Sequence, residues 1–327
     1  MVLTSTQKRM LDKVYPNVQK IVELSHLSGA EILMTVMGSK PAMADAIFLD
    51  TKLQKNLKDI ANYAKKAGLV LATSKYKYIV NSPQGIFKEI AINDPRPGKI
   101  ILALAPTKDK ARKGADYYHA KMIDGRFGYK FGKLMGYPEC CLQFGNYLQN
   151  LDGDINNFGF KNPAIESLKR SKHFDWHLNV FTVSLLPHYP CSFTCPRSID
   201  YVKKVFLYMD YVDKAQSSFL QDYLKNPISL YWTCADRILL YGDLKRTGLM
   251  TGEVKYTRIE PMLTSGTFYQ EVDENKLTEW HKIEKFLKEG NRLVVTDKKC
   301  SVYKDKECLL TINKANKYVP VLVKPDR

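Results

Sequence analysis

Residues 99–106 read KIILALAP, a compact apolar run that stops at a proline. A run of this length, bounded in this way, predicts a buried strand. Residues 108–122 follow with apolar side chains at helical spacing, and this order of strand then helix favours an α/β core. We therefore expect a mixed fold, α+β or α/β.

The chain before this strand has mainly helical signals. Apolar residues recur at helical spacing over residues 6–27, where Pro16 predicts a kink or break and hence an opening helix pair. Further elements are predicted in the order helix 52–67, ended by Gly68, strand 69–73 and strand 76–80. We expect a helical or mixed N-terminal region over residues 1–96.

The C-terminal third is predicted to be rich in strands. The expected strands are 228–233 and 237–241 as a hairpin, then 253–259, 292–296, 308–312 and 318–323. A helix over 277–289 interrupts them and is closed by Gly290 as a C-cap. This pattern divides the chain into an N-terminal region, a cysteine-motif core domain at 97–245 and a β-rich region at 246–327.

Composition predicts a folded protein with a basic surface. Of 327 residues, 45% are hydrophobic and 26% are charged, far from the composition of disordered chains. The 50 Lys and Arg exceed the 34 Asp and Glu, a net charge of +16. Such a charge attracts RNA or another polyanion. The simpler interpretation is that scattered lysines keep the surface solvated, since no block of five like charges occurs.

The sequence also bears on location and on cysteine chemistry. It has no leader with a charged and then an apolar segment, and no run of 18 apolar residues, so we expect a soluble, cytoplasmic protein without membrane contact. Seven cysteines are present, and a reducing compartment disfavours a disulfide framework. Metal or redox chemistry is the more attractive role for these thiols.

The first cysteine segment, GYPECCLQF at 136–144, predicts a helix start. Pro138 suits a first turn, so Cys140 and Cys141 would lie in the first turn or two. The helix dipole there stabilises a thiolate. Adjacent side chains diverge by about 100° on a helix, so we expect one ligand and one supporting or reactive thiol.

The second segment, PHYPCSFTCP at 187–196, has three prolines and cannot form a regular helix. It predicts a stiff loop that leads into a long helix over 198–224. Cys191 and Cys195, followed at once by Pro196, resemble the end of the ligand run in bacterial ferredoxins, although the preceding cysteine steps are missing.

Together the two segments predict a metal centre. An iron–sulfur cluster held by Cys191, Cys195 and one of Cys140 and Cys141 would leave a coordination position for substrate, which suggests a metalloenzyme. Zinc is the alternative, with three cysteines and His188 as ligands. A third interpretation is thiol catalysis without metal, and Cys141 and His188 are the candidate catalytic residues.

Weaker candidates lie near these segments. His173 and His177 are four residues apart on a helix predicted over 165–180, after a loop at 151–163, and this spacing can bind a metal. Residues 125–133 interleave glycines, aromatic residues and basic residues, which makes Arg126 and Lys130 candidate nucleotide contacts. The alternative function is therefore a nucleic-acid-binding or RNA-modifying protein with a structural zinc site.

The remaining thiols have no partner spacing, and we expect core or surface positions for Cys234, Cys300 and Cys308.

The motifs GYPxCC, at 136–141, and HxPCSxxCPxS, at 188–198, resemble those of an uncharacterised prokaryotic family, largely archaeal. The resemblance covers roughly residues 97–245. It implies that both motifs belong to one site, and it brings no established reaction.

Overall fold

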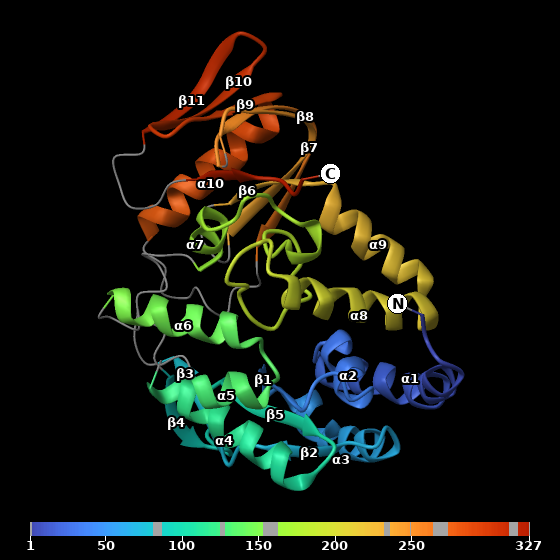
Figure 1. Cartoon of the computed structure of the whole chain (residues 1–327). Helices are drawn as coiled ribbons and strands as arrows, with labels where there is room; N and C mark the ends of the chain where they lie inside the picture. Colours follow the sequence, from blue (N-terminus) through green and yellow to red (C-terminus); the bar gives the residue numbers. More distant parts are fainter. Residues whose placement is uncertain are drawn as a thin grey trace. The chain divides into compact units, whose positions relative to one another are not determined.

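The computed structural model describes residues 2–80, 87–124, 128–152, 163–231, 236–248, 250–263, 274–313 and 320–326. These residues form a mixed α+β fold, as predicted (Figure 1). The chain divides into two compact units, each built from two separated segments. The first unit is Met1–Asn156 with Asp200–Ser218, and the second is Asn157–Ile199 with Phe219–Arg327.

The first unit begins with helices that pack on one another. Its helices are α1 (Ser5–Ser25), α2 (Gly29–Val36), α3 (Thr51–Lys66), α4 (Lys108–Asp124), α5 (Tyr129–Leu134), α6 (Glu139–Asp152), most of α8 (Pro196–Val212) and the start of α9 (Lys214–Lys225). Helix α1 packs against α3 and α2. Its start is fixed by a capping box, in which Thr4 and Gln7 each satisfy a backbone N–H of the other.

The predicted break at Pro16 is wrong, because α1 is one helix with Pro16 inside it. Buried apolar residues lie on both sides of the proline, among them Leu11, Val14, Val18 and Ile21. Burial of this continuous stripe offsets the backbone hydrogen bond that proline cannot donate. The helix pair predicted within residues 6–27 is therefore wrong, and α2 is a separate helix that starts after the chain turns at His26.

A five-stranded antiparallel sheet lies beside these helices. Its strands are β1 (Met43–Phe48), β2 (Val70–Thr73), β3 (Tyr76–Val80), β4 (Phe87–Ala91) and β5 (Lys99–Ala105), in the order β1-β5-β3-β4, with β2 also paired to β5. Every residue of β5 is buried, as its apolar run predicts. Helix α4 packs on β5, β2 and β1. Strands β1 and β4 were not predicted, because the charged side chains of Asp45, Lys88 and Glu89 interrupt their apolar residues.

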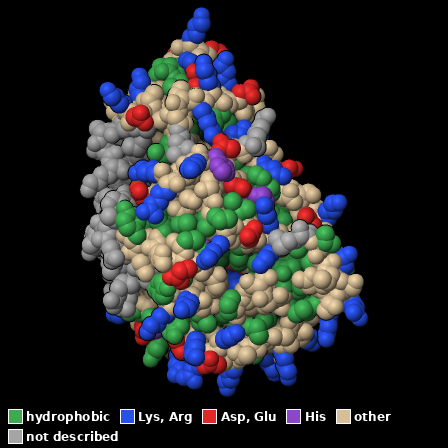
Figure 2. Space-filling view, viewed as in Figure 1, with side chains coloured by type: hydrophobic (Ala, Val, Ile, Leu, Met, Phe, Trp, Pro, Cys, Tyr) green, Lys and Arg blue, Asp and Glu red, His purple; other side chains and the backbone are tan. Residues whose placement is uncertain are grey.

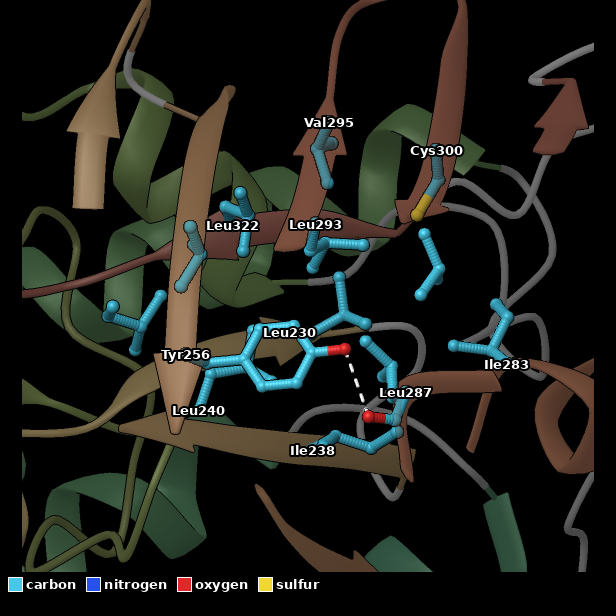
Figure 3. Packing of buried hydrophobic residues seen from close by; sticks show 13 residues of the cluster. Leu230, Ile238, Leu240, Tyr256, Ile283, Leu287, Leu293, Val295, Cys300 and Leu322 are labelled. Atoms are coloured by element: carbon cyan, nitrogen blue, oxygen red, sulfur yellow. Dashed lines mark hydrogen bonds between the residues drawn. The ribbon is translucent and has the colours of Figure 1, made fainter. Parts of the chain in front are cut away.

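The second unit contains a seven-stranded antiparallel sheet, in the order β11-β10-β9-β8-β7-β6-β12. The strands are β6 (Ile228–Tyr231), β7 (Asp236–Arg246), β8 (Gly252–Leu263), β9 (Arg292–Val295), β10 (Lys299–Lys304), β11 (Glu307–Asn313) and β12 (Val321–Val323). Helix α10 (Glu274–Glu289) packs on this sheet and buries Ile283 and Leu287 against its apolar side chains (Figure 3). The β-rich C-terminal part is thus confirmed, with β10 as a strand that the sequence pattern missed.

Two predicted helices are wrong in extent. The helix predicted over 165–180 is α7 (Pro163–Lys169), followed by turns and a single 3-10 turn at Trp176–Leu178. The helix predicted over 198–224 is two helices, α8 and α9, because the Asp213 carboxylate accepts a hydrogen bond from the amide of Gln216 and caps a new helix. Most of the loop predicted at 151–163 lies outside the described residues.

Helices that could span a membrane were sought in the part of the chain that the structure describes, and none there is long and apolar enough.

Candidate metal site

Cys140 and Cys141 lie in the first turn of α6, as predicted. The carbonyl of Pro138 accepts hydrogen bonds from the amides of Cys141, at 2.9 Å, and Leu142, at 3.0 Å, and so starts the helix. Cys141 is buried and Cys140 is half-buried. Their sulfur atoms are 4.0 Å apart. The helix start therefore holds two thiols side by side.

Two glycines set the approach of α5 to α6. Gly136 has a φ of +76°, and a Cβ there would lie 2.7 Å from Cδ of Pro41. A Cβ at Gly132 would lie 2.4 Å from a methyl carbon of Leu142. At Gly136 the positive φ and the nearby proline ring require glycine, whereas a side chain at residue 132 would displace the end of Leu142. Sequence reasoning missed this role, although the Gly-Tyr-Pro order of residues 136–138 is a turn signal.

The loop that carries Cys191 and Cys195 is anchored by Phe193. This side chain is fully buried, with its ring centroid 4.5 Å from that of Phe174 and 5.4 Å from that of Phe181. The Phe193 amide donates to Oγ of Ser171, at 2.6 Å, and its carbonyl accepts from the amide of Asp175, at 3.1 Å. Because the Ser171 side chain and the Asp175 amide bond to the loop, residues 171–175 do not continue the helix that was predicted over 165–180.

Cys195 lies immediately before α8, and Pro196 is the first residue of that helix. The Cys195 carbonyl accepts the hydrogen bond from the amide of Ile199, at 3.0 Å, as an N-cap residue does. Cys195 is buried and Cys191 is half-buried. Cys195 therefore lies at the start of a second helix.

The structure brings the four thiols together. The sulfur atoms of Cys140, Cys141, Cys191 and Cys195 all lie within 4.8 Å of one another, and this group could hold a metal ion. Both adjacent cysteines belong to it, whereas the divergence of neighbouring side chains led us to expect one. Four soft donors at this spacing suit a thiophilic metal.

The histidines predicted near the site are placed differently. Nε2 of His188 lies 3.0 Å from Oγ of Ser198, and His188 is not part of the four-thiol group. His173 lies in a turn after α7, so it does not share a helix face with His177. Nδ1 of His177 lies 2.7 Å from Oδ1 of Asp175, two residues earlier. The helical spacing predicted for the histidine pair is therefore wrong.

The basic and aromatic stretch gives little support for nucleic-acid contact. Arg126 lies outside the described residues, and Lys130 is an exposed residue of α5. Phe131 is buried in a core cluster, so its ring is not available for stacking on a base. On the face shown in Figure 2, Lys and Arg side chains are scattered among other types. This distribution fits the solvated-lysine interpretation, and polyanion binding stays a prediction.

Two of the remaining cysteines are where we expected them. Cys300 is buried in the core of the second unit, and Cys308 is exposed on β11. Cys234 lies outside the described residues.

Comparisons of the chain with protein-family models, curated proteins and solved structures find no match. The family resemblance of the two cysteine motifs stays a prediction, and a functional argument has to rest on the geometry of the four thiols.

Proposed function

We propose that Cys140, Cys141, Cys191 and Cys195 bind one zinc ion, and that this ion stabilises the fold around the two cysteine segments. The observation that supports this proposal is the spacing of the four sulfur atoms, which all lie within 4.8 Å of one another. Tetrahedral zinc with bonds of about 2.3 Å to sulfur separates its thiolates by about 3.8 Å. The 4.0 Å between the sulfurs of Cys140 and Cys141 is close to that value.

An iron–sulfur cluster fits this spacing less well. A cluster places its own iron and sulfide atoms between the cysteine thiolates, so most pairs of thiolates are farther apart than around a single ion. The four sulfurs here leave room for one ion at their centre. Zinc therefore replaces the cluster as the leading hypothesis, and His188 is not needed as a ligand.

Four protein ligands close the coordination shell of zinc. A closed site is the signature of structural zinc, whereas catalytic zinc keeps a position for water or substrate. In this proposal Cys141 is a ligand and not a nucleophile. The competing interpretation is thiol catalysis by Cys140 or Cys141 without metal, and it requires a chain that binds no metal.

The test is metal analysis of protein purified under reducing, anaerobic conditions. We expect one zinc ion per chain, no acid-labile sulfide and no visible colour. Replacement of zinc by Co²⁺ reports the ligands directly, because a tetrahedral four-thiolate site gives intense d–d and sulfur-to-cobalt bands. A brown protein with stoichiometric sulfide would replace zinc by a cluster, and a protein without metal would leave thiol catalysis.

The variants Cys191→Ser and Cys195→Ser should lose zinc. Cys300→Ser and Cys308→Ser are matched controls, one buried and one exposed, and both should keep it. Because a ligand variant can also fail to fold, the Co²⁺ spectrum of the unmodified protein is the deciding measurement. Equal zinc in all four variants would overturn the proposal.

A further inference from the structure

The short segment before the 3-10 turn links the loop that carries the second pair of cysteines to a distant part of the second unit. Its residues Ser171 and Asp175 bond to the backbone of Phe193 in that loop. Between them, Phe174 pairs with Asp326 instead. The Phe174 amide donates to Oδ2 of Asp326, at 2.6 Å, and the Phe174 carbonyl accepts from the Asp326 amide, at 2.8 Å. Asp326 therefore holds the segment that in turn holds the cysteine loop.

The place of Asp326 is fixed by the second sheet. The guanidinium of Arg246, on β7, donates to Oδ1 of Asp326, at 2.6 Å, and also to the carbonyl of Lys324. Just before these residues, β12 is an edge strand of the seven-stranded sheet and pairs with β6. One carboxylate oxygen of Asp326 is thus bonded to the sheet, and the other is bonded to the segment before the loop. We call Arg246 and Asp326 the latch.

Aromatic rings make a second link between the loop and the sheet, and this link does not use the latch. Phe181 packs on Phe193 of the loop, with ring centroids 5.4 Å apart, and on Tyr231 of β6, at 4.9 Å. All three side chains are buried. By contrast, the side chains of Arg246 and Asp326 are 36% and 37% exposed. An ion pair so exposed adds little to global stability, and it opens more readily than a buried ring cluster.

Opening of the latch acts on both cysteines of the loop. Phe193 stands two residues after Cys191 and two residues before Cys195, so its position sets the place of both. Phe174 bonds to Asp326 through its backbone and packs on Phe193 through its ring, with centroids 4.5 Å apart. Loss of the Asp326 bonds therefore loosens one support of Phe193, while the contact with Phe181 stays in place.

We propose that Asp326 is a positioning residue for the proposed zinc site, and that the latch sets how readily the cysteine loop gives up its metal. A chelator takes zinc by replacing the thiolates one after another, and replacement of Cys191 or Cys195 requires the loop to move. A closed latch opposes this movement through the bonds of Phe174. The metal part of the inference rests on the proposed zinc site, whereas the restraint of the loop does not.

The test begins with metal analysis of the unmodified protein, which decides the zinc site itself. The rate of zinc transfer to an excess of a chromogenic chelator is then compared between Asp326→Ala and the unmodified protein. We expect transfer to be about tenfold faster in the variant, the effect of one lost hydrogen bond to a charged group on a local opening step. Arg258→Ala is the matched control, because it removes another ion pair of the second unit, with Glu260 at 2.9 Å, and it should leave the rate unchanged.

Alkylation by iodoacetamide gives a readout that needs no metal. In protein from which metal has been stripped, Cys195, which is 2% exposed, should be alkylated faster in Asp326→Ala than in Arg258→Ala, by the same factor of about ten. Cys300 is equally buried, in the core of the second unit, and should react at one slow rate in both variants. This measurement decides the role of the latch even if the unmodified protein holds no zinc, so the two proposals fail separately.

Two further variants guard against misfolding. Asp326→Asn keeps an oxygen that accepts from the Phe174 amide, so it should keep most of the protection. Arg246→Ala opens the latch without changing Asp326 and should speed both zinc transfer and alkylation, which tests the proposal if Asp326→Ala does not fold. Equal rates in Asp326→Ala, Arg246→Ala and Arg258→Ala would overturn the proposal. Parallel acceleration at Cys195 and Cys300 would also overturn it, because it reports unfolding of the whole unit.

Discussion

Nε2 of His188 lies 3.0 Å from the hydroxyl oxygen of Ser198, a fully buried residue in the first turn of α8. This contact ties the start of the cysteine loop to the helix that follows its end. We infer that His188 positions the loop, and the ligand or catalytic role that its place in the motif suggests stays a prediction.

The first prediction separates these roles. His188→Ala should keep zinc at the level of the unmodified protein, and it should lower the free energy of unfolding by about 1 kcal/mol, since it removes a part-buried hydrogen bond. Cys191→Ser should lose the metal. Metal analysis and urea unfolding measure both effects. If His188→Ala loses as much zinc as Cys191→Ser, His188 is a ligand and the four-thiol assignment is wrong.

The second prediction concerns the turn before Cys140. Gly136→Ala should destabilise the protein by about 2 kcal/mol or more, because alanine is strained at positive φ and its Cβ would meet Pro41. Zinc should also bind more weakly, since the turn positions the first turn of α6. The measurements are thermal unfolding and competition for zinc with a chelator.

Gly38→Ala is the matched control for this turn. Gly38 has a φ of +70°, but a Cβ there would have nothing within 4 Å. This variant should show only the backbone cost, about 1 kcal/mol, and unchanged zinc affinity. If the two variants behave alike, contact with Pro41 does not matter to the site.

Local signals predicted much of the site and part of the fold. The buried strand β5 and the start of α6 follow from an apolar run and from Pro138, which act over a few residues. The two cysteine segments were recognised because proline anchors each of them. That the two segments meet was predicted from chemistry, since no local pattern specifies it, but only one of Cys140 and Cys141 was expected in the group.

Contacts between residues distant in sequence explain most of the errors. The helix predicted over 165–180 ends early because Ser171 and Asp175 bond to Phe193. The hydrogen bond from Tyr118 to Asp45 was missed for a similar reason, since these residues belong to no motif and meet only when β1 and α4 pack together. Hydrophobic periodicity indicates which face of a helix or strand is buried, but it does not indicate which other element packs against that face.

The third prediction concerns pH. A carboxyl group whose pKa is raised by folding stabilises the fold below its unfolded pKa, and this contribution is lost as pH rises through the folded pKa. Burial raises the pKa of Asp45 above its ordinary value of 3.8. Asp45→Asn should therefore raise the thermal midpoint near pH 7, and the gain should shrink at about pH 4. Thermal scans at both values measure this. An equal gain at both values would mean that the charge of Asp45 does not cause it.

The fourth prediction concerns the core of the second unit. The hydroxyl of Tyr256 donates to the carbonyl of Leu287, at 2.9 Å (Figure 3). This carbonyl lies in the last turn of α10, and the amide of Asn291, its usual partner, donates to Tyr303 instead. Tyr256 therefore caps the end of α10 from the neighbouring strand.

Tyr256→Phe should lower the free energy of unfolding by about 1–2 kcal/mol, because it leaves a buried carbonyl without its donor. Leu230→Ala should cost more, about 3 kcal/mol, since it opens a cavity in the same core. Tyr241→Phe removes a hydroxyl bonded to the partly exposed Glu260, where water can replace it, and should cost less than about 0.5 kcal/mol. Urea unfolding of the three variants gives the order. If Tyr256→Phe costs no more than Tyr241→Phe, then water reaches the Leu287 carbonyl and Tyr256 stabilises the sheet only by packing.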